Sequence, residues 1–188
     1  MGLELRDIAA TLKLYRSERK TDHNGAHQRA ITYLEGQFSL ADSEDDLSFL
    51  YQSIAGEHLL YGDVDRAKKT WEEILVRFPN DPLSWISASG FYLYEGSDPS
   101  HSLSLAESGC QIAEKVGRFV IHAHSTRCRA AKALNDYRSM NESIDFILSY
   151  KRPTKSMDSA YECDFLVGLP TGSVSDDKAE KLRALCKR

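Results

Sequence analysis

The 188-residue sequence has none of the features by which membrane and secreted proteins are usually recognised. No apolar run approaches the roughly 18–20 residues that a helix needs to cross a bilayer. The first residues, MGLELRDIAA, carry charges too early for a secretory signal, and Arg6 stands where a myristoylation motif needs Ser or Thr. We therefore expect no interaction with a membrane.

The sequence also has no excess of positive charge and no glycine-rich phosphate loop. Its formal net charge is −4, which argues against nucleic acid as a partner. Neither GxxxxGK[ST] nor GxGxxG occurs, and no strand precedes the GLPTGS stretch at 168–173, as a nucleotide fingerprint would require. We read GLPTGS as a turn and expect no nucleic-acid partner and no cofactor.

Cysteine is scarce and widely spaced. The residues Cys110, Cys128, Cys163 and Cys186 form no CxxC pair and no dense pattern. In a chain of this length, such spacing is typical of reduced thiols and not of a disulfide framework. We therefore expect four free thiols in a cytoplasmic protein.

The residues that are present predict helices. Hydrophobic residues make up 41% and charged residues 28%, which is ordinary for one globular domain with a substantial core. In the stretch 61–82, Gly62 can end one helix in the left-handed conformation and Asp63 can cap the next, which Pro79 stops. Between them, five apolar residues follow the helical period: Ala67, Trp71, Ile74, Leu75 and Phe78.

Similar start and stop signals for helices recur along the chain: a cap at Ser43, Asp-Pro helix starts at 81–82 and 98–99, and a turn at 135–136. They predict helices over 3–20, 26–38, 44–61, 63–78, 82–96, 99–116, 119–134, 137–150 and 175–187, with a short one near 157–166. No segment alternates with the period of a strand. The predicted fold class is all-α.

Helix pairs repeat at a nearly constant interval. GDVDRA at 62–67 aligns with GAHQRA at 25–30, with Gly25 in the turn, and Gly96 follows Gly62 by 34 positions. The segment 48–81 resembles a tetratricopeptide repeat through residues in both helices and the turn: Tyr51, Ile54, Ala55, Gly62, Asp63, Ala67, Trp71 and Pro79. Three further units, within about 10–150, match more loosely.

The resemblance implies a right-handed α-solenoid of antiparallel helix pairs in a single domain over residues 1–188. The units are 3–40, 44–79, 82–117 and 119–150, followed by an irregular segment at 151–174 and a capping helix at 175–187. Because an open end of a solenoid exposes apolar surface, the polar residues around this last helix predict a monomer or at most a weak dimer.

Residues suited to catalysis or metal binding are few. In HAHSTRC at 122–128, His124 and Cys128 share a helix face, but zinc needs three or four ligands and no second pair supplies them. No motif supports a Cys–His nucleophilic pair, and the acidic run at 42–46 is explained by helix capping. We expect a packed histidine, a buried thiol, no metal and no catalytic residue.

Function is therefore expected on a surface. In tetratricopeptide-like stacks the first helix of each unit lines a concave groove that binds protein segments. Carried over to this sequence, the partner-binding positions are Tyr15, Arg16, Arg19, Gln52, Ser53, Ile86, Ser87, Tyr94, Ser125, Thr126, Arg129 and Lys132. Basic residues at both ends, with polar and aromatic residues between them, suit an acidic or extended segment of a protein partner.

Three functions are compatible with the sequence: a non-enzymatic adaptor, a dedicated inhibitor of one partner of the immunity or antitoxin type, and an enzyme whose site assembles only in three dimensions. The segment 151–174 has two interpretations. It folds back across the groove as an internal ligand, or it buries its apolar residues on the last repeat: Tyr161, Phe165, Leu166 and Val167.

Overall fold

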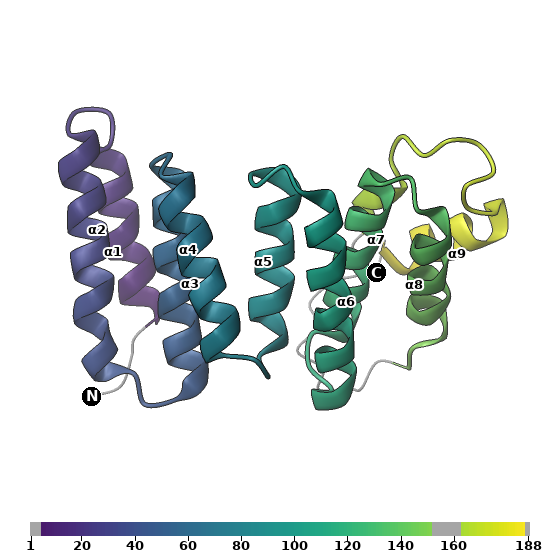
Figure 1. Ribbon diagram of the computed structural model, residues 1–188, viewed down its shortest axis with the longest axis horizontal. Coiled ribbons are helices and arrows are strands. Elements are labelled where there is room, and N and C mark those ends of the chain that lie inside the picture. The colour runs from purple at the N-terminus through teal and green to yellow at the C-terminus, as the bar shows by residue number, and fades with distance from the viewer. Residues whose placement is uncertain (1–4, 152–162, 187–188) are drawn as a thin grey trace. The chain divides into compact units, whose positions relative to one another are not determined.

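The computed structural model describes residues 5–151 and 163–186, and every regular element within them is helical (Figure 1). The α-helices there are α1 (Leu5–Glu18), α2 (His23–Gln37), α3 (Glu44–Leu60), α4 (Val64–Arg77), α5 (Pro82–Tyr94), α6 (Pro99–Val116), α7 (Val120–Ala133), α8 (Tyr137–Ser149) and α9 (Asp176–Cys186). Two short 3-10 turns are η1 (Phe38–Leu40) and η2 (Asp164–Leu166). The all-α prediction is confirmed for this part of the chain. None of these helices is both long enough and apolar enough to cross a membrane.

Side-chain caps start the helices where the sequence predicts them. The Asp63 carboxylate accepts the Arg66 amide at 3.1 Å, and Ser43 Oγ accepts the Asp46 amide at the same distance. Gly62 before α4 has φ 83°, the left-handed conformation that glycine adopts without steric cost. Satisfying the free amides of each first turn sets these helix starts locally.

One predicted turn is wrong. Gly25 lies inside α2, which begins at His23, and the turn falls before it. The reason is Asp22, whose carboxylate accepts the Gly25 amide at 3.0 Å and so caps a helix three residues earlier than expected. The predicted helix near 157–166 lies mostly outside the described residues, and only the turn η2 is seen at its end.

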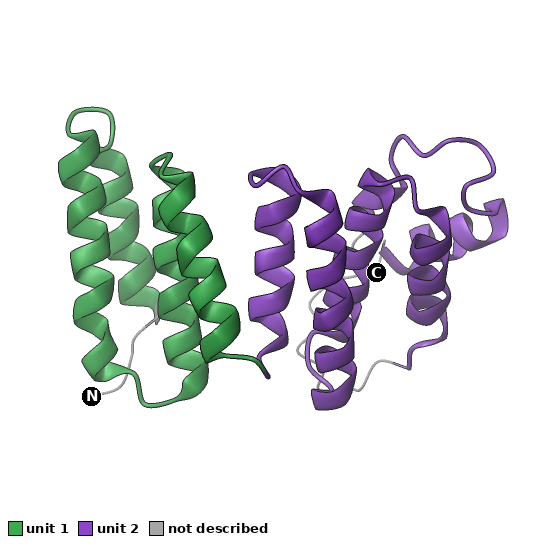
Figure 2. Cartoon of the chain, in the orientation of Figure 1, with its two compact units in different colours: residues 1–79 green, residues 80–188 purple. Residues whose placement is uncertain are grey.

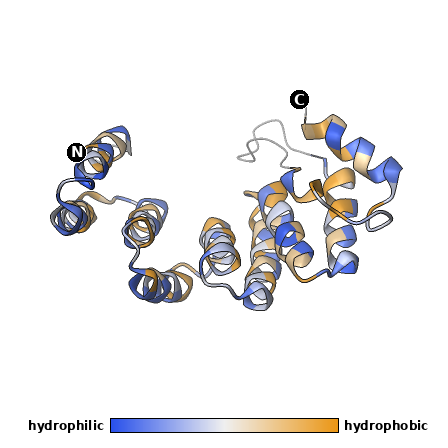
Figure 3. Cartoon of the chain, turned by 90° about the horizontal axis from the view of Figure 1, so that it is seen from above, coloured by the Kyte–Doolittle hydropathy of each residue, from blue (hydrophilic) through white to orange (hydrophobic). Residues whose placement is uncertain are grey.

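The chain divides into two compact units, residues 1–79 and 80–188 (Figure 2). The division falls between the second and third predicted repeat units. Figure 3 shows hydrophilic and hydrophobic residues along the same helices, as expected for amphipathic helices that each bury one side.

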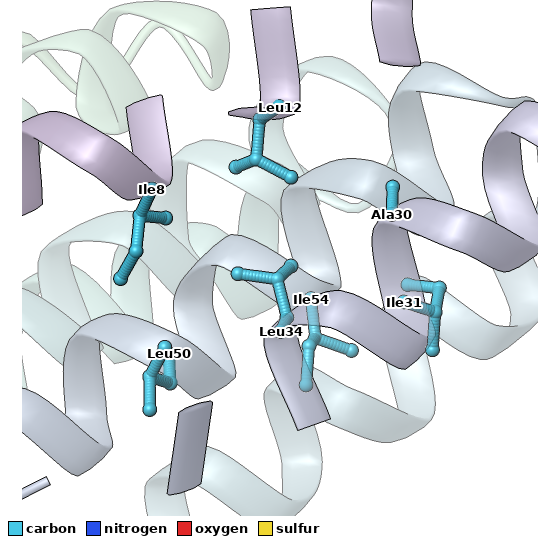
Figure 4. Close-up of a cluster of buried hydrophobic side chains, with 7 residues drawn as sticks. All are labelled: Ile8, Leu12, Ala30, Ile31, Leu34, Leu50 and Ile54. Carbon is cyan, nitrogen blue, oxygen red and sulfur yellow. The ribbon is translucent and has the colours of Figure 1, made fainter. Parts of the chain in front are cut away.

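Unit 1 contains α1 to α4, and its core joins the first three helices. Figure 4 shows side chains from α1, α2 and α3 that are almost completely buried against one another: Ile8, Leu12, Ala30, Ile31, Leu34, Leu50 and Ile54. Between α3 and α4, the small buried residues Ala55 and Ala67 allow close packing. These are the two positions at which the tetratricopeptide resemblance expects small residues.

Unit 2 contains α5 to α9, in which consecutive helices from α5 to α8 pack against each other and α5 also packs against α7. Gly109 of α6 permits a close approach to α5, because a Cβ atom there would lie 3.3 Å from Trp85 Cβ. At the C-terminal end, Phe165 of η2 and Leu182 of α9 join the core of α7 and α8. Ala179 and Leu182 are the buried residues of α9.

The expectation of four free thiols is wrong. Cys163 and Cys186 form a disulfide, with Cα atoms 6.3 Å apart, whereas Cys110 and Cys128 are free and buried. The partners are 23 residues apart, and they meet only because α9 packs back toward η2. The disulfide also removes the argument from free thiols for a cytoplasmic location, which stays a prediction.

Candidate functional site: the α5–α7 groove

Two adjoining cavities of about 400 and 360 Å³ lie between α5, α7 and η2 in unit 2. They share four lining residues and together form what we call the α5–α7 groove. Its α5 wall contains Ile86, Ser87, Gly90, Leu93 and Tyr94. Its α7 wall contains His122, Thr126, Arg129, Lys132 and Ala133. Each of the two cavity volumes is in the range of ligand-binding clefts.

The α5 wall combines a buried floor with an exposed aromatic ring. Helix α5 is apolar on most sides because it packs on both α6 and α7. Ile86 is only 3% exposed, whereas Tyr94 in the last turn is 63% exposed. An exposed tyrosine beside an apolar floor offers contact area at small conformational cost, and tyrosine is enriched where proteins bind one another.

The α7 wall contributes a carboxylate-binding arginine. Arg129 donates from Nε to Asp164 Oδ2 at 2.9 Å and from Nη2 to Asp164 Oδ1 at 2.8 Å. The arginine side chain is 17% exposed and the aspartate 59%. Parallel bonds of this kind give an arginine both strength and directional preference for a carboxylate. They also hold the pKa of Asp164 below its ordinary value.

Lys132, one turn further along α7, donates from Nζ to the carbonyl oxygen of Val167. We call Arg129 and Lys132 the basic end of the groove. Between the two contacts, Phe165 is 2% exposed and packs with Cys128 and other core residues. In the described part of the 151–174 segment, Phe165 is buried on the last repeat, whereas Val167 is 73% exposed. Asp164 and the Val167 carbonyl contact the basic end, as the internal-ligand interpretation predicts for this end of the groove. Tyr161 lies outside the described residues.

Six of the seven partner-binding positions predicted in unit 2 line this groove: Ile86, Ser87, Tyr94, Thr126, Arg129 and Lys132. The seventh, Ser125, is fully buried within unit 2, which corrects its expected place on the groove. Helical geometry explains the difference, because Ser125 lies one residue, or about 100°, from Thr126.

Sequence reasoning missed several lining residues. His122 and Leu93 are one helical turn and one residue, respectively, from the predicted positions Thr126 and Tyr94. The helical period therefore could have identified His122 as a neighbour on the same face. No local signal could have identified Asp164, because it reaches Arg129 across 35 residues of sequence.

The positions predicted in unit 1 make mostly internal contacts. Arg16 donates from Nε to Glu57 Oε1 at 2.8 Å, and the Arg19 guanidinium lies 5.4 Å from the centre of the Tyr61 ring. Tyr15 lines a shallow hollow of about 300 Å³ on α1 and α2.

Gln52 donates to Ser48 Oγ at 2.9 Å, and the Ser53 hydroxyl donates to the carbonyl of Phe49 at 2.8 Å. Both side chains thus bond within α3. The unit 1 positions are not gathered around one cavity, in contrast to those of unit 2.

Two histidines of unit 1 contact Tyr61, and a third contacts one of them. His23 donates from Nε2 to the Tyr61 carbonyl at 3.1 Å, and the His27 ring stacks on the Tyr61 ring with centroids 4.7 Å apart. His27 Nε2 also lies 3.1 Å from His58 Nδ1, so one nitrogen donates and the other accepts. Burial lowers the pKa of both His27 and His58, and the neighbouring His27 lowers that of His58 further, while Asp63 opposes the shift in both.

We expect unit 1 to lose stability in mild acid. The folded-state pKa values of His27 and His58 lie below the ordinary value of 6.5, so the unfolded chain binds more protons in the window below that pH. Stability is therefore complete above the window and falls as the pH drops through it. Unfolding free energies at about pH 8 and about pH 5 measure the loss. A His58→Gln variant should lose less on acidification; an equal loss would contradict this assignment.

His124 and Cys128 are packed, as the sequence predicts. The His124 ring stacks on Phe146 with centroids 3.9 Å apart, and its Nε2 lies 3.0 Å from Glu114 Oε1. Burial lowers the pKa of His124 against the effect of Glu114, and burial raises the pKa of Cys128. Such a thiol is a poor nucleophile. Among residues 5–151 and 163–186, no group of three metal-ligating side chains comes together.

No model of a protein family and no curated protein matches the chain.

Proposed function

We propose that this chain is a non-enzymatic interaction module that binds an extended, carboxylate-bearing segment of a partner protein in the α5–α7 groove. The observation that carries this proposal is the carboxylate of Asp164, which Arg129 already holds through two bonds at one end of the groove. A site that holds one carboxylate in this way suits another of the same geometry.

The rest of the groove favours a peptide over a small ion. Beyond the basic end it continues past Tyr94 and Leu93 to Ile86, so an extended chain could place apolar side chains along α5. Tyrosine and arginine are among the residue types that contribute most to protein–protein affinity. A carboxylate on Arg129 would fix the direction of the bound segment, and contacts along α5 would supply affinity.

The fold that we propose for this module is a tetratricopeptide-like right-handed α-solenoid of antiparallel helix pairs. Side-chain caps between successive helices and the paired small residues of α3 and α4 support it. In such a solenoid α5 and α7 are the first helices of their repeats, which is where the family binds its partners.

We expect Tyr94→Ala to weaken partner binding by roughly tenfold, as for a moderate hot-spot residue. The measurement is fluorescence polarisation with a panel of labelled extended peptides that differ by Asp or Asn at one position, under oxidising and reducing conditions. Because Tyr94 is 63% exposed, the substitution should leave the fold intact. Arg138→Ala on α8, whose side chain is 90% exposed away from the groove, is the matched control.

The proposal would be wrong if the aspartate peptides bound no better than their asparagine counterparts in either condition. It would also be wrong if Tyr94→Ala and Arg138→Ala had equal effects on binding. If the groove binds carboxylates, the aspartate peptide must bind more tightly than the asparagine peptide, and Tyr94→Ala must weaken binding more than Arg138→Ala.

A further inference from the structure

The disulfide is placed directly beside the carboxylate that occupies the groove. Cys163 precedes Asp164, and its partner Cys186 is at the end of α9. Both cysteines are partly exposed, whereas the two free cysteines are buried. The residues of the disulfide therefore contact solvent, whereas those of the two free thiols hardly do.

Three separate contacts dock the segment after Cys163. Arg129 holds the Asp164 carboxylate, Lys132 donates to the Val167 carbonyl, and Phe165 is buried between them. The docked sequence is a carboxylate followed by a large aromatic side chain. A carboxylate and an apolar side chain are also what we propose that the partner segment places in the groove.

We propose that residues 163–167 are a built-in occupant of the basic end of the groove, and that the Cys163–Cys186 disulfide keeps them in place of a partner segment. This inference rests on the proposed function and adds its regulation. The partner segment that it predicts has Asp or Glu followed by Phe or another large apolar residue. Such a segment can take over both the contact with Arg129 and the site of Phe165.

The disulfide acts by making release of the occupant costly. While it is intact, Cys163 is tethered to the end of α9, so the backbone at the start of the occupant cannot leave the groove without moving α9, which is anchored by buried Leu182. Once the disulfide is broken, η2 can open without moving α9, and opening then costs the exposure of Phe165 and the loss of the Arg129 and Lys132 contacts. The effective concentration of residues 163–167 at the basic end of the groove then falls, and a partner segment competes more easily for the same site.

The chemical step is a thiol–disulfide exchange with a dithiol reductant. One thiolate of the reductant attacks a sulfur of the Cys163–Cys186 bond, which breaks to give a mixed disulfide and releases the other cysteine as a thiolate. The second thiolate of the reductant then attacks the mixed disulfide and releases the remaining cysteine as a thiolate. The reductant is oxidised to its own disulfide, and two electrons and two protons give two cysteine thiols. Reoxidation reverses the step.

A peptide copy of the occupant tests the proposal in trans. A labelled DFLVGL peptide, which copies residues 164–169, should bind the reduced protein roughly tenfold or more tightly than the oxidised protein. The Cys163→Ser/Cys186→Ser variant should bind it tightly under both conditions. A peptide with Asn in place of Asp should bind weakly to every form.

Hydrogen exchange measures release without any ligand. The amide of Leu166 donates to the Cys163 carbonyl at 3.1 Å, and that of Val167 donates to the Asp164 carbonyl at 3.0 Å. We expect both amides to exchange roughly tenfold faster on reduction, while the amides of α6 are unchanged. In the double serine variant, the reductant should have no further effect.

The outcomes separate the two proposals. Exchange that does not change on reduction would overturn the disulfide-controlled occupant, and so would equal binding of DFLVGL to the oxidised and reduced protein. Neither result would affect the proposed function, which is tested by the Asp and Asn peptide panel. Faster exchange together with tight binding of DFLVGL only after reduction supports the inference.

Discussion

Leu34→Ala should lower the free energy of unfolding of unit 1 by about 3 kcal/mol, the usual cost of an unfilled leucine cavity. Leu34 of α2 is fully buried between α1 and α3, where it packs with residues such as Ile8 and Leu50 (Figure 4). Three helices meet at this side chain, so its loss leaves a cavity that no single helix can fill by moving.

Denaturant unfolding, followed by the fluorescence of buried Trp71 in α4, measures the effect. Trp85 of unit 2 is replaced by Phe in both proteins so that the signal reports on unit 1. Leu14→Ala is the matched control, because Leu14 lies on α1 but is 57% exposed, and its substitution should cost less than about 0.5 kcal/mol. Equal losses for the two variants would contradict the packing of α1, α2 and α3 around Leu34.

Arg16→Met should lower the free energy of unfolding by about 2 kcal/mol, because it leaves the Glu57 carboxylate buried without its charged partner. Glu57 is fully buried on α3, and Oε2 makes no hydrogen bond among the described residues. Its Oε1 accepts two bonds from Arg16 of α1. The arginine side chain is 48% exposed, so water reduces the cost below the 3–5 kcal/mol or so of a fully buried pair.

The double variant Arg16→Met/Glu57→Leu should recover most of the lost stability, since it removes the buried charge itself. Methionine keeps the packing of the arginine stem, so the single variant tests charge and not volume. Arg29→Met is the control: Arg29 bonds Glu18 and Asp22, but all three side chains are substantially exposed. A loss no larger than that of Arg29→Met, or no recovery in the double variant, would contradict this role.

The Arg16 contact also bears on function. The resemblance to tetratricopeptide repeats predicts that Arg16 binds the partner, but its guanidinium already neutralises a buried carboxylate. A partner that took over Arg16 would leave Glu57 unpaired, at a cost in stability. The α5–α7 groove of unit 2 does not face this conflict, because Asp164 is 59% exposed and lies on a short turn.

Much of the secondary structure was predictable because its signals are local. Asp63, Asp81 and Asp98 cap helices within three residues of themselves, and Gly62 takes a left-handed conformation. The error at Gly25 has the same origin, since the Asp22 side chain caps the helix three residues before its predicted start. The groove positions of α5 and α7 were also accessible, because side chains on one helix face recur at a known period.

The sequence by itself therefore determined the helices, most of their ends and six of the groove positions on α5 and α7. Only the tertiary structure decided which cysteines pair, which carboxylate Arg129 holds, and that Arg16 serves Glu57. These contacts join residues 23, 35 and 41 positions apart. Helix signals act over a few residues, whereas pairing at such separations depends on how whole helices pack, and neither composition nor spacing records that.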